Sequence, residues 1–310
     1  MKKVLRFIVL AAALTFVCCT EKDTTIGDDQ EQTSPEDDPE DNEDAESFWD
    51  DIEWPITEYV FPDPIFRGYV FKFFDIDKDG KISKEEALNV EYIDVSDSEI
   101  KSLAGLEYFP KLSKLYCSKS ELTSLDVSMN PNLSELDCSS NKLTNLDVSM
   151  NPNLEYLDCS ESKLTSLDVS MNPNLEYLDC WYNQLTSLDV SMNPNLEYLD
   201  CSRNPLKSLD VSMNPNLSSL NCYSNQLTSL DVSKNPNLKR LDCSSNQLTS
   251  LDVSMTKLDY NSSYFPYPLN CSNMLSLQTL TLKRGWSING INVNRSTNYI
   301  PSHTDILYVD

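Results

Sequence analysis

Seven cysteines recur at a fixed interval of 21 residues, and this interval limits the fold more than any other feature of the sequence. They are Cys117, Cys138, Cys159, Cys180, Cys201, Cys222 and Cys243. A constant period between about 20 and 50 residues indicates a repeat protein, in which each unit packs against its neighbours. One unit cannot bury its own apolar side chains, so the chain should grow as a solenoid rather than divide into globular domains.

One unit runs from Leu133 to Asn153 and has the pattern LxxLxCxxNxLTxLDVSxNPN. Leu136 and Cys138 are two residues apart, so they should lie on one face of a short strand. The remaining inward positions are Leu133, Leu143, Leu146 and Val148. Neighbouring cysteines would lie about 5 Å apart, but parallel side chains rarely reach the disulfide dihedral, so free buried thiols are favoured over bridges.

An asparagine follows most of the expected strands, where it can hydrogen-bond the backbone of the turn. These residues are Asn141, Asn183, Asn204, Asn225 and Asn246. Ser120 and Ser162 replace asparagine in two coils, which should be weaker locally. The second turn is Asn-Pro-Asn, as at 151–153, and its geometry is expected to be fixed by proline and by side-chain hydrogen bonds.

The core of the unit, LxxLxCxxNxL, resembles the leucine-rich repeat with cysteine in place of the third leucine. The resemblance covers roughly Tyr92 to Tyr260. It implies a mainly β repeat solenoid with short parallel strands over residues 92–258. Residues 259–310 should form a C-terminal cap, with strands expected at 277–282 and 306–309, because the last coil of a solenoid must be covered.

Residues 57–91 are expected to form an N-terminal cap that contains a calcium loop. A helix should begin with Asp63 as its cap and Pro64 in its first turn. The segment DIDKDGKISKEE then fills the ligand positions of an EF-hand-like loop with Asp75, Asp77, Asp79, Lys81 (through its carbonyl), Ser83 and Glu86. Calcium prefers six to eight oxygen ligands, and this spacing supplies them on one loop. The expected cofactor is one structural Ca²⁺; the alternative is an acidic turn without metal.

The first 19 residues have the pattern of an export signal. A basic start is followed by an apolar run over residues 7–17 that is too short to span a membrane comfortably. The run ends at Cys18 and Cys19 and resembles a bacterial lipoprotein signal, which implies a lipid on Cys19 (or Cys18). An ordinary cleaved signal is the alternative. Residues 20–56 are strongly acidic and should form an extended tether.

The charged residues 21–23 resemble the surface-export signal of lipoproteins from the Bacteroides group. Together with the repeats and the calcium loop, the chain resembles a cell-surface leucine-rich-repeat lipoprotein of that group. The resemblance implies an outer-membrane lipoprotein that faces out of the cell and touches the membrane only through its lipid. The net charge of −25 argues against nucleic-acid binding.

Function should reside in side chains that point outward from the expected concave strand face. The candidate ligand-binding residues are Tyr156, Tyr177, Tyr198, Trp181, Tyr182, Tyr223, Asp158, Asp179 and Asp200. Clustered exposed aromatic residues are typical of interfaces. Duplication of the block EYLDC explains the tyrosines equally well. It does not explain Trp181 and Tyr182, which replace the residues of the other units.

Two columns of aspartate are expected, one through Asp137 and Asp158 beside the strands and one through Asp126 and Asp147 on the second half of each coil. Carboxylates about 5 Å apart repel one another, which raises pKa values or attracts cations. Turn capping is the favoured explanation for the second column. For the first, capping and attraction of a basic partner remain equally open.

No catalytic constellation accompanies the single histidine, His303, so we expect a non-enzymatic protein. The favoured function is binding of a protein ligand, basic or host-derived, or adhesion. The alternatives are a glycan-binding accessory lipoprotein and a purely structural surface protein.

Overall fold

The computed structural model describes residues 53–258, 268–283, 291–292 and 304–309. The expected export signal, the cysteines Cys18 and Cys19, most of the acidic tether and His303 lie outside the described residues.

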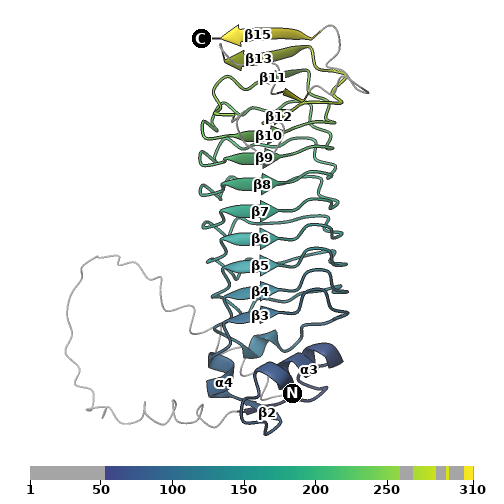
Figure 1. Cartoon of the computed structure of the whole chain (residues 1–310), viewed down its shortest axis with the longest axis vertical. Coiled ribbons are helices and arrows are strands. Elements are labelled where there is room, and N and C mark those ends of the chain that lie inside the picture. The colour runs from purple at the N-terminus through teal and green to yellow at the C-terminus, as the bar shows by residue number, and fades with distance from the viewer. Residues whose placement is uncertain (1–52, 259–267, 284–290, 293–303, 310) are drawn as a thin grey trace, which may run out of the picture. The chain divides into compact units, whose positions relative to one another are not determined.

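Parallel strands stacked in chain order form the main sheet (Figure 1). In the described part of the chain its members are β3 (Tyr92–Asp94), β4 (Lys114–Tyr116), β5 (Glu135–Asp137), β6 (Tyr156–Asp158), β7 (Tyr177–Asp179), β8 (Tyr198–Asp200), β9 (Ser219–Asn221), β10 (Arg240–Asp242), β12 (Leu269–Asn270) and β14 (Ile291–Asn292). Equivalent residues pair directly, for example Leu157 with Leu178. The predicted repeat solenoid with short parallel strands is confirmed.

The inward leucines, valines and cysteines form one continuous core along the stack. Leu136, Cys138, Leu143 and Val148 are all 0% exposed, and their equivalents repeat this burial in the following coils. The repeat cysteines are free thiols in the described residues, as predicted; they are Cys117, Cys138, Cys159, Cys180, Cys201, Cys222, Cys243 and Cys271. Burial raises the pKa of the Cys138 thiol well above its usual range, so it behaves as a small apolar side chain.

Buried asparagines run along the stack in two ladders. In the first, Asn141 donates from Nδ2 to the carbonyls of Cys117 and Cys138 at 2.9 and 3.0 Å, and its Oδ1 accepts from the Leu122 amide. The second ladder is formed by the first asparagine of each Asn-Pro-Asn turn, such as Asn151, which is 0% exposed. Side-chain bonding in this turn was expected, but complete burial of its first residue was not.

The N-terminal cap begins earlier in the chain than expected. Strand β1 (Glu53–Pro55) pairs antiparallel with β2 (Lys81–Ser83), placing Trp54 opposite Ile82. Residues 53–55 were assigned to the acidic tether, so that part of the boundary was wrong. The apolar side chain of Trp54 explains the difference, because it packs on Tyr108 at a ring distance of 5.2 Å.

Two helices complete the cap. Helix α3 (Pro64–Phe73) begins where predicted, because Asp63 accepts hydrogen bonds from the amides of Ile65 and Phe66. Helix α4 (Lys84–Leu88) is only five residues long and leads into the first strand of the stack. A 3-10 turn at Leu106–Tyr108 follows Gly105, whose φ of +110° suits glycine, and whose added Cβ would lie 2.3 Å from Phe61.

At the other end of the stack, β11 (Ser250–Asp252), β13 (Thr279–Lys283) and β15 (Asp305–Val309) form a second parallel sheet. Strands were predicted at 277–282 and 306–309, and both are confirmed with shifted ends. None of the helices in the described residues is long and apolar enough to cross a membrane.

Candidate functional site

The strand face consists of the side chains that point outward from β4 to β10. Each of these strands buries its central leucine and leaves the two flanking residues partly or wholly accessible, with Asp200 as a nearly buried exception. Because equivalent residues pair in register, each flanking position repeats along the stack as a column. The predicted columns are therefore present, and their environments can be compared.

The tyrosine column, Tyr156, Tyr177 and Tyr198, is a continuous stack of rings. Neighbouring ring centres are 4.3 Å apart, with interplanar angles of 11° and 3°. Both faces of Tyr177 are covered by its neighbours, so this ring presents its edge and hydroxyl outward. Burial, followed by the nearby Tyr198 and Asp179, raises the pKa of Tyr177, so its hydroxyl stays protonated.

The strand aspartate column lies beside the tyrosines and contains Asp137, Asp158, Asp179, Asp200 and Asp242, with Asn221 between the last two. Each aspartate accepts a hydrogen bond from the amide two residues later, as Asp179 does from Trp181 at 2.9 Å. Burial and then the charges of Asp200 and Asp158 raise the pKa of Asp179 to about 8. Burial likewise raises the pKa values of Asp158 and Asp200.

Asp179 is consequently protonated in large part near neutral pH, so it carries less charge than the sequence suggests. Repulsion within the column was predicted and contributes, but burial is the larger cause. Asp179 is thus a weaker attractant for a basic partner than an ordinary aspartate.

The outer aspartate column comprises Asp126, Asp147, Asp168, Asp189, Asp210, Asp231 and Asp252. Its members are exposed or nearly so, and each caps the turn that follows. Asp189, for example, accepts from the Ser191 amide at 2.9 Å. This hydrogen bond lowers the pKa of Asp189 below its usual value. The predicted role in turn capping is confirmed.

The predicted aromatic residues Trp181, Tyr182 and Tyr223 meet around a cation that sequence reasoning missed, Arg203. The guanidinium carbon lies 5.8, 5.9 and 5.4 Å from the centres of these three rings respectively. Arg203 Nε also donates a hydrogen bond to the Tyr223 hydroxyl. The signal that could have found it is a column two residues after each cysteine, where Arg203 stands among residues such as Ser140 and Ser224.

That column has an unusual backbone. Tyr182 and Arg203 have φ values of 54° and 50°, and their equivalents in the other coils are also left-handed. Bulky side chains rarely adopt this conformation, which is costly without glycine. The geometry directs the amide of Arg203 to the Tyr223 carbonyl of the next coil, at 2.9 Å. The same turn brings both side chains to the edge of the strand face.

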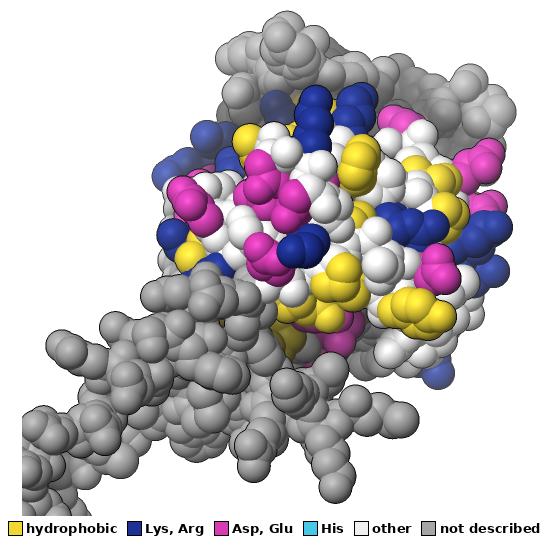
Figure 2. Space-filling view, turned by 90° about the horizontal axis from the view of Figure 1, so that it is seen from below, with side chains coloured by type: hydrophobic (Ala, Val, Ile, Leu, Met, Phe, Trp, Pro, Cys, Tyr) yellow, Lys and Arg dark blue, Asp and Glu magenta, His cyan; other side chains and the backbone are white. Residues whose placement is uncertain are grey.

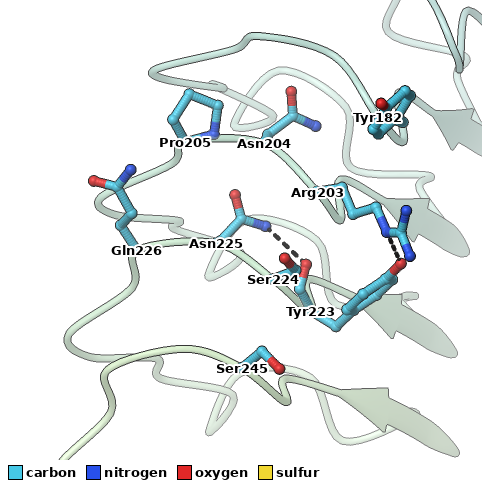
Figure 3. Close-up of a pocket in the computed structure, with 9 residues that line it drawn as sticks. All are labelled: Tyr182, Arg203, Asn204, Pro205, Tyr223, Ser224, Asn225, Gln226 and Ser245. Atoms are coloured by element: carbon cyan, nitrogen blue, oxygen red, sulfur yellow. Dashed lines mark hydrogen bonds between the residues drawn. The ribbon is translucent and has the colours of Figure 1, made fainter. Parts of the chain in front are cut away.

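Tyr182, Arg203, Pro205, Tyr223 and Gln226 line an open hollow of about 510 Å³ together with neighbouring polar residues (Figure 3). In the close-up, Arg203 and Tyr223 point toward each other on the strand side, while Pro205 and Gln226 lie on the opposite side. The hollow therefore combines one cation, aromatic edges and amide groups.

The expected metal loop gathers three of its six predicted residues. Ligand oxygens of Asp75, Asp77 and Glu86 all lie within 4.8 Å of one another. Burial acts to raise the pKa of Glu86, but hydrogen bonds from Ser83 and Ile76 lower it, so the group is held ionised. A compact set of carboxylates is the donor chemistry that a hard cation requires.

The other three predicted residues have different contacts. Asp79 accepts from the Lys81 amide at 2.8 Å and lies 3.8 Å from Lys81 Nζ. Lys81 also forms an ion pair with Glu53 of strand β1. Ser83 caps helix α4 and bonds to Glu86. Figure 2 views this end of the stack, where acidic and basic side chains are interspersed and apolar side chains form separate patches.

Comparison with known proteins places these features in a family context. The model of "Leucine Rich repeats (2 copies)" matches residues 173–212 and 215–259. Over 70 residues the chain is 42% identical to Internalin J of Listeria monocytogenes serotype 4b (strain F2365), which corresponds to 23% of this chain and 8% of that protein. Most of the relative's length therefore has no counterpart in the match.

Among solved structures, the functional domain of InlJ from Listeria monocytogenes, described as including a cysteine ladder, is 36% identical. The match covers 75% of this chain and 57% of that one, with a TM-score of 0.55. Internalin C2 from the same species shares the fold at 21% identity, with 66% and 92% coverage and a TM-score of 0.60. Internalin-like leucine-rich-repeat proteins are non-enzymatic.

Proposed function

We propose that this chain, a leucine-rich-repeat protein related to the internalins, is a non-enzymatic binding protein displayed on a bacterial surface. Its strand face over β6 to β9 contacts a host protein. The observation that carries the proposal is the concentration of aromatic side chains on these coils, with Trp181 and Tyr182 departing from the repeat pattern. Aromatic residues and arginine dominate the energetics of protein interfaces.

The tyrosine geometry favours a protein partner over a glycan. A sugar ring stacks on the open face of an aromatic ring, but both faces of Tyr177 are covered. The guanidinium of Arg203 already lies against Trp181, Tyr182 and Tyr223. The surface therefore offers edges, hydroxyls and a cation, which suit the mixed chemistry of a protein surface.

Substitutions that restore residues used in other coils test this proposal with little risk to folding. The test variant combines Trp181→Ser, Tyr182→Ser and Tyr177→Ser, because serine occupies these columns at Ser139, Ser140 and Ser219. The control combines Met171→Lys and Met192→Lys, exposed positions where the column also contains Lys234. Binding to host-cell surface protein should be lost in the test variant and kept in the control.

Pretreatment of the host cells separates the remaining alternatives. Proteinase treatment should abolish binding, while glycosidase treatment should leave it unchanged. Loss only after glycosidase treatment would instead support the glycan-binding alternative. Equal behaviour of the two variants would contradict a functional strand face and support a purely structural protein.

We propose in addition that the loop at Asp75 holds one structural Ca²⁺. Asp75, Asp77 and Glu86 form the carboxylate cluster that would bind it. In this proposal Asp79, Ser83 and the Lys81 carbonyl complete the oxygen set. The cation would neutralise three clustered carboxylates next to β2, the strand that pairs with β1. Calcium titration should raise the midpoint of thermal unfolding, and Asp75→Asn should remove this effect. Glu85→Gln, an exposed neighbour outside the cluster, is the matched control.

Surface display and its lipid anchor form the third part of the proposal. Cys19 (or Cys18) carries the lipid, and the acidic segment after it holds the folded part away from the membrane. Proteinase treatment of intact cells followed by blotting should remove the repeat domain. Metabolic labelling with a fatty acid should mark the wild-type chain and fail after substitution of both cysteines by serine.

A further inference from the structure

Arg203 presents a preorganised cation at the edge of the strand face. Its Nε donates to Tyr223, and its guanidinium lies against three aromatic rings. Its two terminal nitrogens have no hydrogen-bond or ion-pair partner among the residues that the structure describes. A guanidinium held in this way offers a planar pair of donors with less side-chain entropy left to lose.

The strand aspartate of the same coil, Asp200, is already engaged. Asp200 Oδ1 accepts from the amide and hydroxyl of Ser202, and its Oδ2 accepts from Asn221 Nδ2 at 2.6 Å. Asn221 itself stands where other coils have aspartate, which removes one negative charge beside the hollow. Arg203 is the one charged side chain among the residues that line the hollow, so the charge within it favours an anion.

The coil that carries Arg203 departs from the pattern in ways that packing alone does not require. In neighbouring coils the residue after the ladder asparagine donates its amide to the previous coil, as Gln184 and Gln226 do at 2.8 Å. Pro205 occupies this position next to Arg203 and cannot donate. Pro205 thus costs the coil one hydrogen bond to its neighbour, and the same residue lines the hollow.

We propose that the hollow at Arg203 receives an aspartate or glutamate side chain of the protein partner. This rests on the proposed function of the strand face. The guanidinium fork matches a carboxylate in two parallel hydrogen bonds. A hollow of about 510 Å³ that is open to solvent accommodates one projecting side chain beside Tyr182 and Tyr223. An acidic sugar fits less well, because the adjacent ring faces are engaged.

The test uses the whole chain and an array of peptides in matched pairs, in which each acidic residue is replaced by its amide in the twin. Uronate-containing and sulfated oligosaccharides are printed on the same surface. Arg203→Ser restores the residue found at Ser140 and Ser224. Lys207→Thr removes one exposed charge from the same coil and restores the residue found at Thr186 and Thr228. Arg203→Lys keeps the charge but not the fork.

Wild type and Lys207→Thr should prefer the acidic peptides over their twins, with binding that weakens as salt rises. Arg203→Ser should bind them at least about tenfold more weakly, and Arg203→Lys should fall between. Absence of an acidic preference, equal binding by Arg203→Ser, a response to the oligosaccharides alone, or no binding by the wild type would each overturn the proposal.

The proposed function fails separately. If host-protein binding depends on Tyr177 and Trp181 but not on Arg203, the strand face is the interface and the carboxylate pocket is wrong. If host-protein binding is insensitive to all of these residues while acidic peptides still need Arg203, the pocket stands and the proposed strand-face function is wrong.

Discussion

Each coil contains two copies of nearly the same hexapeptide, and the two copies fold differently. The first, such as LDCSSN at 136–141, belongs to the strand side, and the second, LDVSMN at 146–151, belongs to the outer turn. In both, aspartate caps the amide two residues later and asparagine is buried. The same local chemistry therefore appears in two surroundings.

The copies differ in where their backbone hydrogen bonds go. In the first, Ser140 is left-handed and donates to Ser160 of the next coil at 2.8 Å. In the second, the amide of Asn151 returns to Val148 of its own turn at 3.0 Å. One copy thus bonds across coils, and the other closes on itself.

Proline after the second asparagine is an obvious local cause, but the coil with Pro205 argues against it. There the first copy is also followed by proline, yet Arg203 keeps its left-handed φ of 50°. Asn204 also keeps its bonds to Cys180 and Cys201. Pairing of the strands with the neighbouring coils therefore fixes the geometry of the first copy, and tertiary contact overrides local sequence.

The largest expected difference lies in the two asparagine ladders. Asn183 uses Nδ2 for the carbonyls of Cys159 and Cys180 and Oδ1 for the amide of Leu164. Asn193 makes two bonds through Nδ2, but its buried Oδ1 has no partner. Asn183→Ala should cost about 3 kcal/mol, and Asn193→Ala roughly 1–2 kcal/mol, because fewer buried groups are orphaned.

Urea unfolding followed by circular dichroism measures this difference. Repeat arrays can lose two-state behaviour, so the midpoint should be confirmed with a second probe such as intrinsic fluorescence. Equal costs for the two variants would mean that the unpartnered Oδ1 has no energetic consequence.

The reverse substitution should sharpen the same contrast. Ser162 interrupts the first ladder, and its buried hydroxyl has no hydrogen-bond partner. Ser162→Asn places an amide where it can reach the backbone of adjacent coils, so it should stabilise the protein by about 1 kcal/mol. Ser166→Asn, an exposed change at a column that contains Asn145, is the control and should leave the urea midpoint unchanged.

The two aspartate columns should respond to pH in different windows. Asp179 has a folded pKa raised to about 8, so its contribution to stability is present below the unfolded pKa near 3.8 and is lost as pH rises toward 8. Asp189 has a lowered pKa, so its contribution is present above about 3.8 and is lost in acid.

Asp179→Asn should therefore stabilise the protein at pH 8 and flatten the loss of stability between pH 4 and pH 8. The chain contains a precedent, because Asn221 in this column still accepts from the Tyr223 amide and donates to Asp200. Asp189→Asn should change only the acid side of the curve of stability against pH. Thermal unfolding across the pH range distinguishes them, and a matching response of both variants would contradict the contrast in burial.

Much of this fold follows from the sequence because equivalent positions of successive repeats pack against one another. A period of 21 residues identifies which leucines and cysteines pack together, and the stack confirms them. The helix start at Asp63 also follows from local chemistry. The pairing of Trp54 with Ile82 could not be predicted from the sequence, because it joins segments 28 residues apart that share no repeated pattern.

The candidate site could be predicted only in part for the same reason. Trp181 and Tyr182 are visible as departures from the repeat. Their meeting with Arg203 depends on a left-handed backbone that neighbouring coils impose, and spacing alone does not reveal it. Burial of Asp179 likewise depends on the packing of neighbouring coils, so the sequence alone did not show that its pKa is raised.

The smallest expected effect on stability concerns the sulfur chemistry of the two copies. The first copy places cysteine inside, where Cys138, Cys159 and their equivalents are 0% exposed and their pKa values are raised by burial. The second places methionine outside, and the exposed members are Met150, Met171, Met192, Met213 and Met255. Dilute hydrogen peroxide should convert these thioethers to sulfoxides, with water as the other product, while the thiols remain reduced.

Peptide mass spectrometry after peroxide treatment should place oxygen on the exposed methionines, and the thermal unfolding midpoint should move by no more than about 1 °C, because no buried contact is altered. In urea the cysteines should become reactive together, since the same unfolding step exposes them. Oxidation of any ladder cysteine before the methionines in the folded protein would show that the strand side opens more readily than the outer turn, the opposite of what inter-coil bonding predicts.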